Sequence, residues 1–314
     1  MGRHESSTFA IDEIPDLSGY VIIVTGGNQG VGYATTLHLA KRHARVYLAA
    51  RSKTRAMQAI EEMKRVDSSI DVRFLLLDLQ SMASVKEAAE QFMREETQLD
   101  ILIHNAGIMA VPYQVTDDGY ESQIQTNYLS PYAFTRAILP ALERAAAAHP
   151  GDPNRVRVVN VSSSGHNFAP SIGIDFEDIN MSSHTGEFAP WRRYGQFKLA
   201  MIHNAYSLNE RYKIRGITAY SLNPGNIKTN LQQNAASISG TIIRGLTFIS
   251  QFSLLSTDDG SRTSLFCATS PNAPQSAAKY HEPFGKVSKK KFDHKQAEKL
   301  WDWTESELAR FNIF

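Results

Sequence analysis

Short apolar runs alternate with longer stretches of helical periodicity along most of the chain. The runs are continuous and rich in β-branched residues, as in the strands of a parallel sheet that is covered on both faces. We predict six strands, at residues 20–25, 45–50, 72–77, 99–104, 157–161 and 216–221. We predict helices at residues 31–42, 53–65, 81–96, about 121–148 (broken by Pro131 and Pro140) and about 191–212. The alternation predicts an α/β fold with a doubly wound parallel sheet flanked by helices.

The chain shows no Pro/Gly/Ser-rich linker and no charge boundary that would divide it. We therefore expect a single domain over residues 18–314, preceded by a flexible tail at 1–17. Long irregular stretches follow the fifth and sixth predicted strands, at the carboxyl edge where such sheets bind ligands. We expect substrate loops there, at about residues 164–190 and 226–256. The basic run at 288–295 is interpreted as solvated surface.

Composition excludes several other classes of protein. The 33 Lys+Arg residues nearly balance 32 Asp+Glu residues, which gives no electrostatic case for nucleic acid as a ligand. The single cysteine, Cys267, excludes an internal disulfide and a thiolate metal cluster, so we expect no metal site. The N-terminus lacks the apolar segment of a secretory signal, and the longest apolar stretch, 241–255, is too short and interrupted to span a membrane. We expect a cytoplasmic protein without stable membrane insertion.

A glycine-rich loop, TGGNQGVG, joins the first predicted strand to the first helix at residues 25–32. Glycines at such a junction allow a tight turn and a close approach to a pyrophosphate, which the helix N-terminus then binds. A ligand-free turn would also need glycine, so both interpretations stay open. The candidate contacts to a dinucleotide are Gly26, Asn28, Gln29, Gly30, Val31 and Gly32.

The end of the second predicted strand bears on the choice of cofactor. An NAD site usually has an acidic residue here for the ribose, whereas NADP requires a cation for its 2′-phosphate. Ala49 and Ala50 stand at this place, followed by Arg51 and, one helical turn later, Arg55. The pattern favours NADP(H), the alternative being that Arg51 is a surface residue capping the strand.

Two further segments end at the same edge. Asp78 and Leu79 follow the third strand, and Asn105, Ala106 and Gly107 follow the fourth. They are placed to line the adenine and ribose of a dinucleotide, although each alone is also typical of an ordinary turn.

Tyr194 and Lys198 are four residues apart and share one face of the fifth predicted helix. A phenol has a pKa of about 10, and a neighbouring ammonium lowers it toward the range useful for acid–base catalysis. Ser162, Ser163 and Ser164 end the fifth strand and could hold a substrate oxygen. A lone Y-x-x-x-K pair and serines at a strand end are both common by chance.

Together these segments resemble the short-chain dehydrogenase/reductase family, over roughly residues 18–310. The resemblance rests on TGGNQGVG, NAG at 105–107, VNVSS at 159–163, Y-x-x-x-K at 194–198 and the Pro-Gly segment at 223–229. The most similar subgroup is the retinol-dehydrogenase-like and fungal-type NADP-dependent reductases. The resemblance implies a Rossmann-type fold.

The family also implies roles for individual residues. Ser163 would orient the substrate oxygen, and Tyr194 would be the general acid or base. Lys198 would lower the pKa of Tyr194 and hold the nicotinamide ribose, and Asn127 would support a proton-relay water. Pro224, Gly225, Ile227 and Thr229 would contact the nicotinamide end of the cofactor. Two departures from the pattern are Phe197, where many relatives have serine, and Gln29, where some NADP-preferring members have a basic residue.

The function expected on this basis is NADP(H)-dependent interconversion of a carbonyl and an alcohol, with reduction favoured. Aromatic and aliphatic residues in the two long loops suit an apolar or aromatic small molecule. Two alternatives remain open: a non-redox enzyme such as an isomerase, dehydratase or cyclase, and a non-catalytic NADP-binding regulator. The apolar segment 231–255 is assigned to substrate, membrane or a second subunit without a choice among them, and a homodimer or homotetramer is possible.

Overall fold

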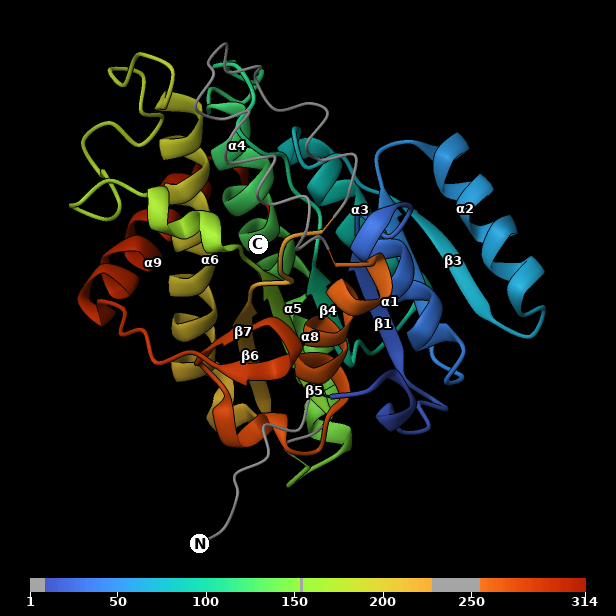
Figure 1. Cartoon of the computed structure of the whole chain (residues 1–314). Coiled ribbons are helices and arrows are strands. Elements are labelled where there is room, and N and C mark those ends of the chain that lie inside the picture. The colour runs from blue at the N-terminus through green and yellow to red at the C-terminus, as the bar shows by residue number, and fades with distance from the viewer. Residues whose placement is uncertain (1–8, 153–154, 228–254) are drawn as a thin grey trace, which may run out of the picture.

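The computed structural model describes residues 9–152, 155–227 and 255–314. Within these ranges a single eight-stranded sheet runs through the molecule in the order β3-β2-β1-β4-β5-β6-β7-β8 (Figure 1). The strands are β1 (Val21–Thr25), β2 (Arg45–Ala50), β3 (Asp71–Leu76), β4 (Ile101–His104), β5 (Val156–Val161), β6 (Ile217–Leu222), β7 (Tyr280–Glu282) and β8 (Lys286–Val287). All neighbouring pairs are parallel except β7 and β8. The six predicted strands are confirmed to within a residue or two at each end.

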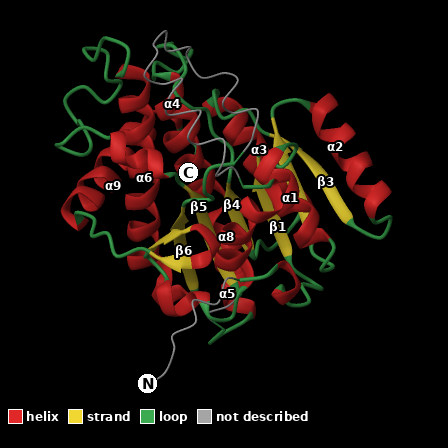
Figure 2. Ribbon diagram, in the orientation of Figure 1, coloured by secondary structure: helices red, strands yellow, loops and turns green. Residues whose placement is uncertain are grey.

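Helices cover both faces of the sheet (Figure 2). On one face lie α1 (Gly30–Ala40), α2 (Lys53–Val66) and α8 (Thr257–Thr269). On the other lie α3 (Met82–Glu95), α5 (Ser130–Ala148), α6 (Ala189–Tyr212) and α9 (His294–Leu308). Because each face is covered, every residue of β4, β5 and β6 is buried, and apolar residues predominate in these strands. Among the described helices, none is long and apolar enough to cross a membrane.

The fourth helical region differs from the prediction. It begins with a single turn, α4 (Ser122–Ile124), continues as a π-helical turn, η2 (Gln125–Leu129), and runs directly into α5. Pro131 has no N–H to donate and lies in the first turn of α5, and Pro140 lies on the exposed side of α5. Neither proline breaks the helix. The irregularity is instead the π turn, a feature often found at functional sites.

The expected flexible tail is wrong for residues 9–17. Phe9, Ile14 and Leu17 are buried at 4%, 2% and 1% exposure and belong to the core beneath α1 and α8. The Leu17 amide donates to the Arg42 carbonyl (2.7 Å). This packing could not be predicted from the sequence, because the three apolar residues stand among polar ones without the spacing of a strand or a helix. Residues 1–8 lie outside the described part of the chain.

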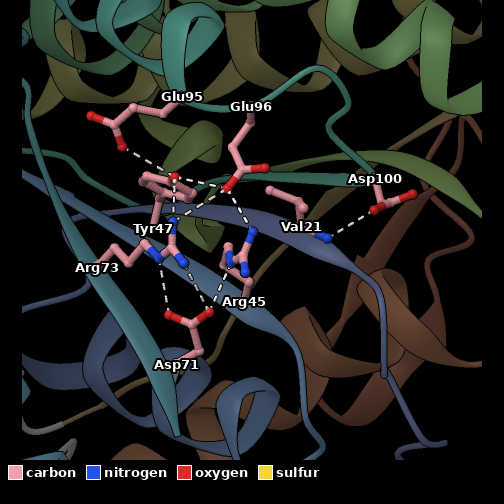
Figure 3. A network of polar contacts seen from close by, with 8 residues as sticks. All are labelled: Val21, Arg45, Tyr47, Asp71, Arg73, Glu95, Glu96 and Asp100. Atoms are coloured by element: carbon pink, nitrogen blue, oxygen red, sulfur yellow. Dashed lines mark hydrogen bonds and ion pairs between the residues drawn. The ribbon is translucent and has the colours of Figure 1, made fainter.

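The amino ends of the strands are joined by a network of charged side chains (Figure 3). Arg45 of β2 contacts Asp71 of β3 (2.7 Å) and Glu96 after α3 (3.0 Å). The Tyr47 hydroxyl lies 2.9 Å from Glu96, and Arg73 pairs with the Asp71 carboxylate (3.0 Å). These contacts hold two neighbouring strands and a helix end together at the edge opposite the predicted ligand site.

The central strands are tied at the same edge by one buried carboxylate. Asp100, 1% exposed, accepts a hydrogen bond from the Val21 amide (2.8 Å) and pairs with Arg155 (2.5 Å). It therefore links the starts of β1, β4 and β5. Burial raises the pKa of Asp100, while the Val21 amide and the Arg155 guanidinium oppose that rise.

The packing of the N-terminal segment gives a stability prediction. Leu17→Ala should lower the free energy of unfolding by about 2–4 kcal/mol, because it removes a fully buried side chain and leaves a cavity. Urea unfolding would measure this. The control is Ile214→Ala at a 93% exposed position, which should change the stability by less than about 0.5 kcal/mol. Equal, small effects of the two changes would mean that residues 9–17 do not pack in solution.

Candidate active site

A cavity of about 660 Å³ opens at the carboxyl ends of the strands. It lies where the strand order reverses between β1 and β4, the usual ligand site of a doubly wound sheet. Its wall includes these predicted residues: Gly26, Asn28, Gln29, Gly30, Val31, Gly32, Arg51, Arg55, Asp78, Leu79, Asn105, Ala106, Gly107, Ser163, Tyr194, Lys198, Pro224, Gly225 and Ile227. Thr229 lies outside the described residues. Segments far apart in sequence thus meet at one cavity.

The glycine loop is packed so closely against the end of β4 that a larger side chain would not fit. A Cβ on Gly32 would lie 2.3 Å from the Gly26 carbonyl oxygen and 2.4 Å from the Asn105 amide nitrogen. Gly26 and Gly30 adopt positive φ angles of 67° and 57°. Gln29, at the N-cap of α1, makes no side-chain cap, so the first amides of the helix are available to an anion. This cradle fits the pyrophosphate of a dinucleotide.

Asn105 and Thr25 join the ends of β4 and β1. The Asn105 side chain donates to the Thr25 carbonyl (3.0 Å), and the amides of Asn105 and Ala106 both donate to the Thr25 hydroxyl (3.0 Å each). These bonds fix the cavity floor across the point where the strand order reverses. The NAG segment is therefore more than an ordinary turn.

Two guanidinium groups lie at the far end of the cavity. Arg51 follows β2 directly, Arg55 lies in the first turn of α2, and both side chains are exposed. Across from them, Asp78 caps its own turn by accepting the Gln80 amide (3.0 Å). No carboxylate ends β2, so this end of the cavity suits a phosphate.

The other end of the cavity holds the predicted reactive residues. Lys198 is buried, and its ammonium donates to the Val161 carbonyl at the end of β5 (2.9 Å). The Ser162 hydroxyl donates in return to the Lys198 carbonyl (2.6 Å). The Lys198 Nζ atom lies 5.8 Å from the centre of the Tyr194 ring, and the Ser163 hydroxyl lies close enough to Tyr194 to lower its pKa.

Two glycines let the serine segment lie directly against α6. A Cβ on Gly165 would be 2.5 Å from the Tyr194 ring, and one on Gly195 would be 2.5 Å from the Ala169 amide nitrogen. The segment forms a short 3₁₀ helix, η3 (Ser164–Phe168), for which the Ser163 hydroxyl is the N-cap. This close contact between η3 and α6 fixes the distance between Ser163 and Tyr194.

The pKa values of the pair correct one expectation. Burial raises the pKa of Tyr194 to about 12, and the Ser163 hydroxyl only partly offsets that rise. Burial also lowers the pKa of Lys198 to about 8. We expected the ammonium to lower the pKa of the phenol. Burial instead has the largest effect on the phenol, and the ammonium donates to the Val161 carbonyl. At neutral pH Tyr194 is therefore protonated and able to donate.

Asn127 lies in the π turn, behind the cavity wall. Its side chain accepts from the Ile108 amide (2.8 Å) and donates to the Ile108 carbonyl (2.9 Å). A Cβ on Gly107 would lie 2.9 Å from the Asn127 Oδ1 atom and 3.4 Å from the Lys198 ammonium. Asn127 and Lys198 thus meet beside the main chain of Gly107, although Asn127 itself does not line the cavity.

Several lining residues were missed. Thr126 precedes Asn127 in the π turn, and its buried hydroxyl has no partner among the described residues. Ile108 and Met109 follow the NAG segment, and Thr257 begins α8, a helix that sequence analysis did not predict. Thr126, Ile108 and Met109 could have been found from the sequence because each is next to a motif residue. Thr257 has no such neighbour in the sequence.

Comparisons with known proteins agree with this geometry. The family model described as short chain dehydrogenase matches residues 20–173. A short-chain dehydrogenase/reductase of Aspergillus calidoustus, drtF, is 41% identical over 310 residues, which cover 95% of this chain and 96% of that protein. The chain belongs to the short-chain dehydrogenase/reductase family. Retinol dehydrogenase 12 of Mus musculus is 33% identical over 289 residues, covering 91% of this chain and 85% of that one.

The solved structures show the same architecture. A crystal structure of an uncharacterised protein from Mycobacterium paratuberculosis superposes with a TM-score of 0.71 and 29% identity, covering 96% of this chain and 97% of that one. The fold, the family and its retinol-dehydrogenase-like type are as predicted. As a family member, this short-chain dehydrogenase/reductase is an oxidoreductase acting on CH–OH or C=O groups of small molecules.

The buried ammonium leads to a stability prediction. Since the pKa of Lys198 falls from 10.5 to about 8 on folding, the charged form destabilises the folded chain. Lys198→Met should be about 2 kcal/mol more stable at pH 7, after the lost bond to Val161 is subtracted. As the pH rises, the folded chain releases this proton at a lower pH than the unfolded chain does. The free energy of unfolding of wild type therefore rises from about pH 8 to 10.5, and the difference in stability between Lys198→Met and wild type should shrink over that range.

Chemical unfolding of both proteins at several pH values measures this difference. Lys213→Met, an exposed lysine that follows α6, is the control and should give no pH-dependent difference. A variant less stable than wild type at pH 7 would show that the ammonium stabilises the fold.

Proposed function

We propose that this protein reduces ketones or aldehydes of apolar or aromatic small molecules with NADPH, Tyr194 donating the proton. The observation that carries the proposal is one cavity with the Tyr194–Ser163–Lys198 group at one end and the Arg51–Arg55 pair at the other. When bound, the cofactor supplies the hydride. Two solved proteins of the same fold, RhlG of Pseudomonas aeruginosa and chicken carbonyl reductase, are complexes with NADP and NADPH.

Each protein residue then has one task. The glycine loop and the first turn of α1 hold the pyrophosphate, and Arg51 and Arg55 hold the 2′-phosphate. Lys198 lies where the nicotinamide ribose would be held. Ser163 accepts the Gly165 amide (3.0 Å), which leaves its hydroxyl proton free to bind a substrate oxygen. Tyr194, kept protonated by burial, donates to that oxygen as its negative charge develops.

Aromatic rings form a path from the surface to Tyr194. Phe168 is 51% exposed and packs edge-on against Trp191 (5.7 Å between ring centres), which packs against Tyr194 (6.4 Å). Phe188 and Ile172 are exposed in the same loop region, at 58% and 60%. This surface favours an apolar or aromatic substrate. The residues expected here from 231–255 lie outside the described part up to residue 254.

Tyr194→Phe tests the proposal. The variant should lose at least about 10³-fold in kcat for NADPH-dependent reduction of an apolar ketone such as an aryl alkyl ketone, because it removes the proposed proton donor. NADPH binding, followed by fluorescence, should persist. Tyr206→Phe, which removes a hydroxyl from the same helix away from the cavity, is the matched control and should keep wild-type turnover. Full turnover in Tyr194→Phe would reject the role of Tyr194.

Arg51→Ala tests the choice of cofactor. It should weaken NADPH binding at least about tenfold, or about 1.4 kcal/mol, and leave NADH binding little changed, because only NADPH carries the 2′-phosphate. Titration by cofactor fluorescence measures both affinities. Arg65→Ala, an exposed arginine near the end of α2, is the control. Equal losses for both cofactors would contradict 2′-phosphate recognition by Arg51.

A further inference from the structure

One lysine of the basic run at 288–295 is not simply solvated. The Lys290 ammonium donates to the His166 Nε2 atom (2.8 Å) and to the Asn167 side-chain oxygen. Lys290 is exposed like its neighbours Lys289 and Lys291, but those two make no hydrogen bond with the part of the chain that the structure describes. The run therefore reaches the segment that carries Ser163, more than a hundred residues earlier in sequence.

The two contacts of the His166 ring determine its protonation state. Its Nδ1 atom lies 2.7 Å from the Ser163 carbonyl oxygen, which can only accept, so Nδ1 carries the hydrogen. An ammonium can only donate, so the Nε2 atom facing Lys290 carries none. His166 is thus neutral with its hydrogen on Nδ1. In water, the hydrogen of a neutral imidazole can occupy either ring nitrogen.

The ring is also enclosed. His166 is 4% exposed and lies edge-on to Tyr280 of β7 (5.0 Å) and to Phe292 of the basic run (5.6 Å). Burial lowers the pKa of His166, and Lys290 lowers it further, whereas Glu282 raises it. Lys290 and Glu282 are the charged side chains that act on this ring within the described residues.

The Ser163 carbonyl receives two hydrogen bonds from one residue. The His166 Nδ1 atom donates at 2.7 Å and the His166 amide at 3.1 Å. Both close the turn in which the Ser163 hydroxyl accepts the Gly165 amide and Gly165 contacts the Tyr194 ring. A shift of this carbonyl would therefore move the Ser163 hydroxyl relative to Tyr194.

We propose that Lys290 is a positioning residue: by holding His166 in its Nδ1-protonated neutral form, it fixes the Ser163 turn against Tyr194. The inference rests on the proposed function, because it assigns Lys290 to the same reaction. Without the ammonium, the hydrogen of neutral His166 is free to move to Nε2. The ring then offers Ser163 a lone pair instead of a donor.

The test compares three neighbouring lysines. Lys290→Met should lower kcat about 5- to 20-fold with the KM for NADPH unchanged, whereas Lys289→Met and Lys291→Met should match wild type. Lys290→Arg, which keeps a cationic donor, should recover most of the activity. Equal kcat values for all three methionine variants would overturn the proposal.

A double mutant and a pH series separate positioning from loss of structure. In His166→Asn the amide can still donate to Ser163 but has no atom in place of Nε2, so adding Lys290→Met should cause no further loss. The activity of Lys290→Met relative to wild type should rise as the pH falls, because protonated His166 carries hydrogen on both nitrogens. The proposal would be contradicted if Lys290→Met lowered kcat equally in wild type and in His166→Asn, and if the activity of Lys290→Met relative to wild type did not change with pH. Lys290 would then act by another route.

Failure of the proposed function gives a different result. In that case wild type itself shows no reduction of carbonyls by NADPH, or Tyr194→Phe keeps full activity. If wild type and Tyr194→Phe behave as expected but Lys290→Met has the same kcat as Lys289→Met, the positioning role alone is rejected.

Discussion

The junction between α6 and the end of β5 is the contact on which the site depends. Lys198 donates from its buried ammonium to the Val161 carbonyl, and Ser162 donates back to the Lys198 carbonyl, so helix and strand are joined twice within one turn. This contact sets the position of Tyr194 relative to Ser163. It also buries a cation whose pKa falls to about 8, a cost that the rest of the fold must offset. A site that is destabilising in itself is expected where chemistry requires a desolvated charge.

The two edges of the sheet have different tasks. The amino edge is tied by Arg45, Asp71, Glu96 and Asp100, which fix the strands relative to one another. The carboxyl edge keeps glycines, exposed arginines and helix amides that have no side-chain cap, so its polar groups are available to a ligand. Because the strands are fixed at their amino ends and the binding groups lie at their carboxyl ends, residues distant in sequence form one cavity.

Sequence alone predicted strands β1 to β6 and most of the residues that line the cavity, because buried parallel strands are rich in apolar residues and the motif residues follow them directly. It failed where the signal was tertiary. The packing of Phe9, the continuation of the helix through Pro140 and the whole of α8 and α9 depend on contacts with distant segments. Lys198 was expected to set the pKa of Tyr194, whereas burial is the largest influence on that pKa and raises it. The basic run is largely exposed, as expected, but the sequence could not show that Lys290 also meets His166.

In the proposed reaction, hydride and proton reach one carbonyl at the Tyr194 end of the cavity. The most direct measurement uses NADPH carrying deuterium at both C4 positions of the nicotinamide ring, incubated with the enzyme and an aryl alkyl ketone, with the alcohol product examined by mass spectrometry. We expect an alcohol that carries deuterium on its carbinol carbon. A product that forms without deuterium, or with NADPH unconsumed, would contradict the proposed reaction and favour a non-redox reaction on the same fold.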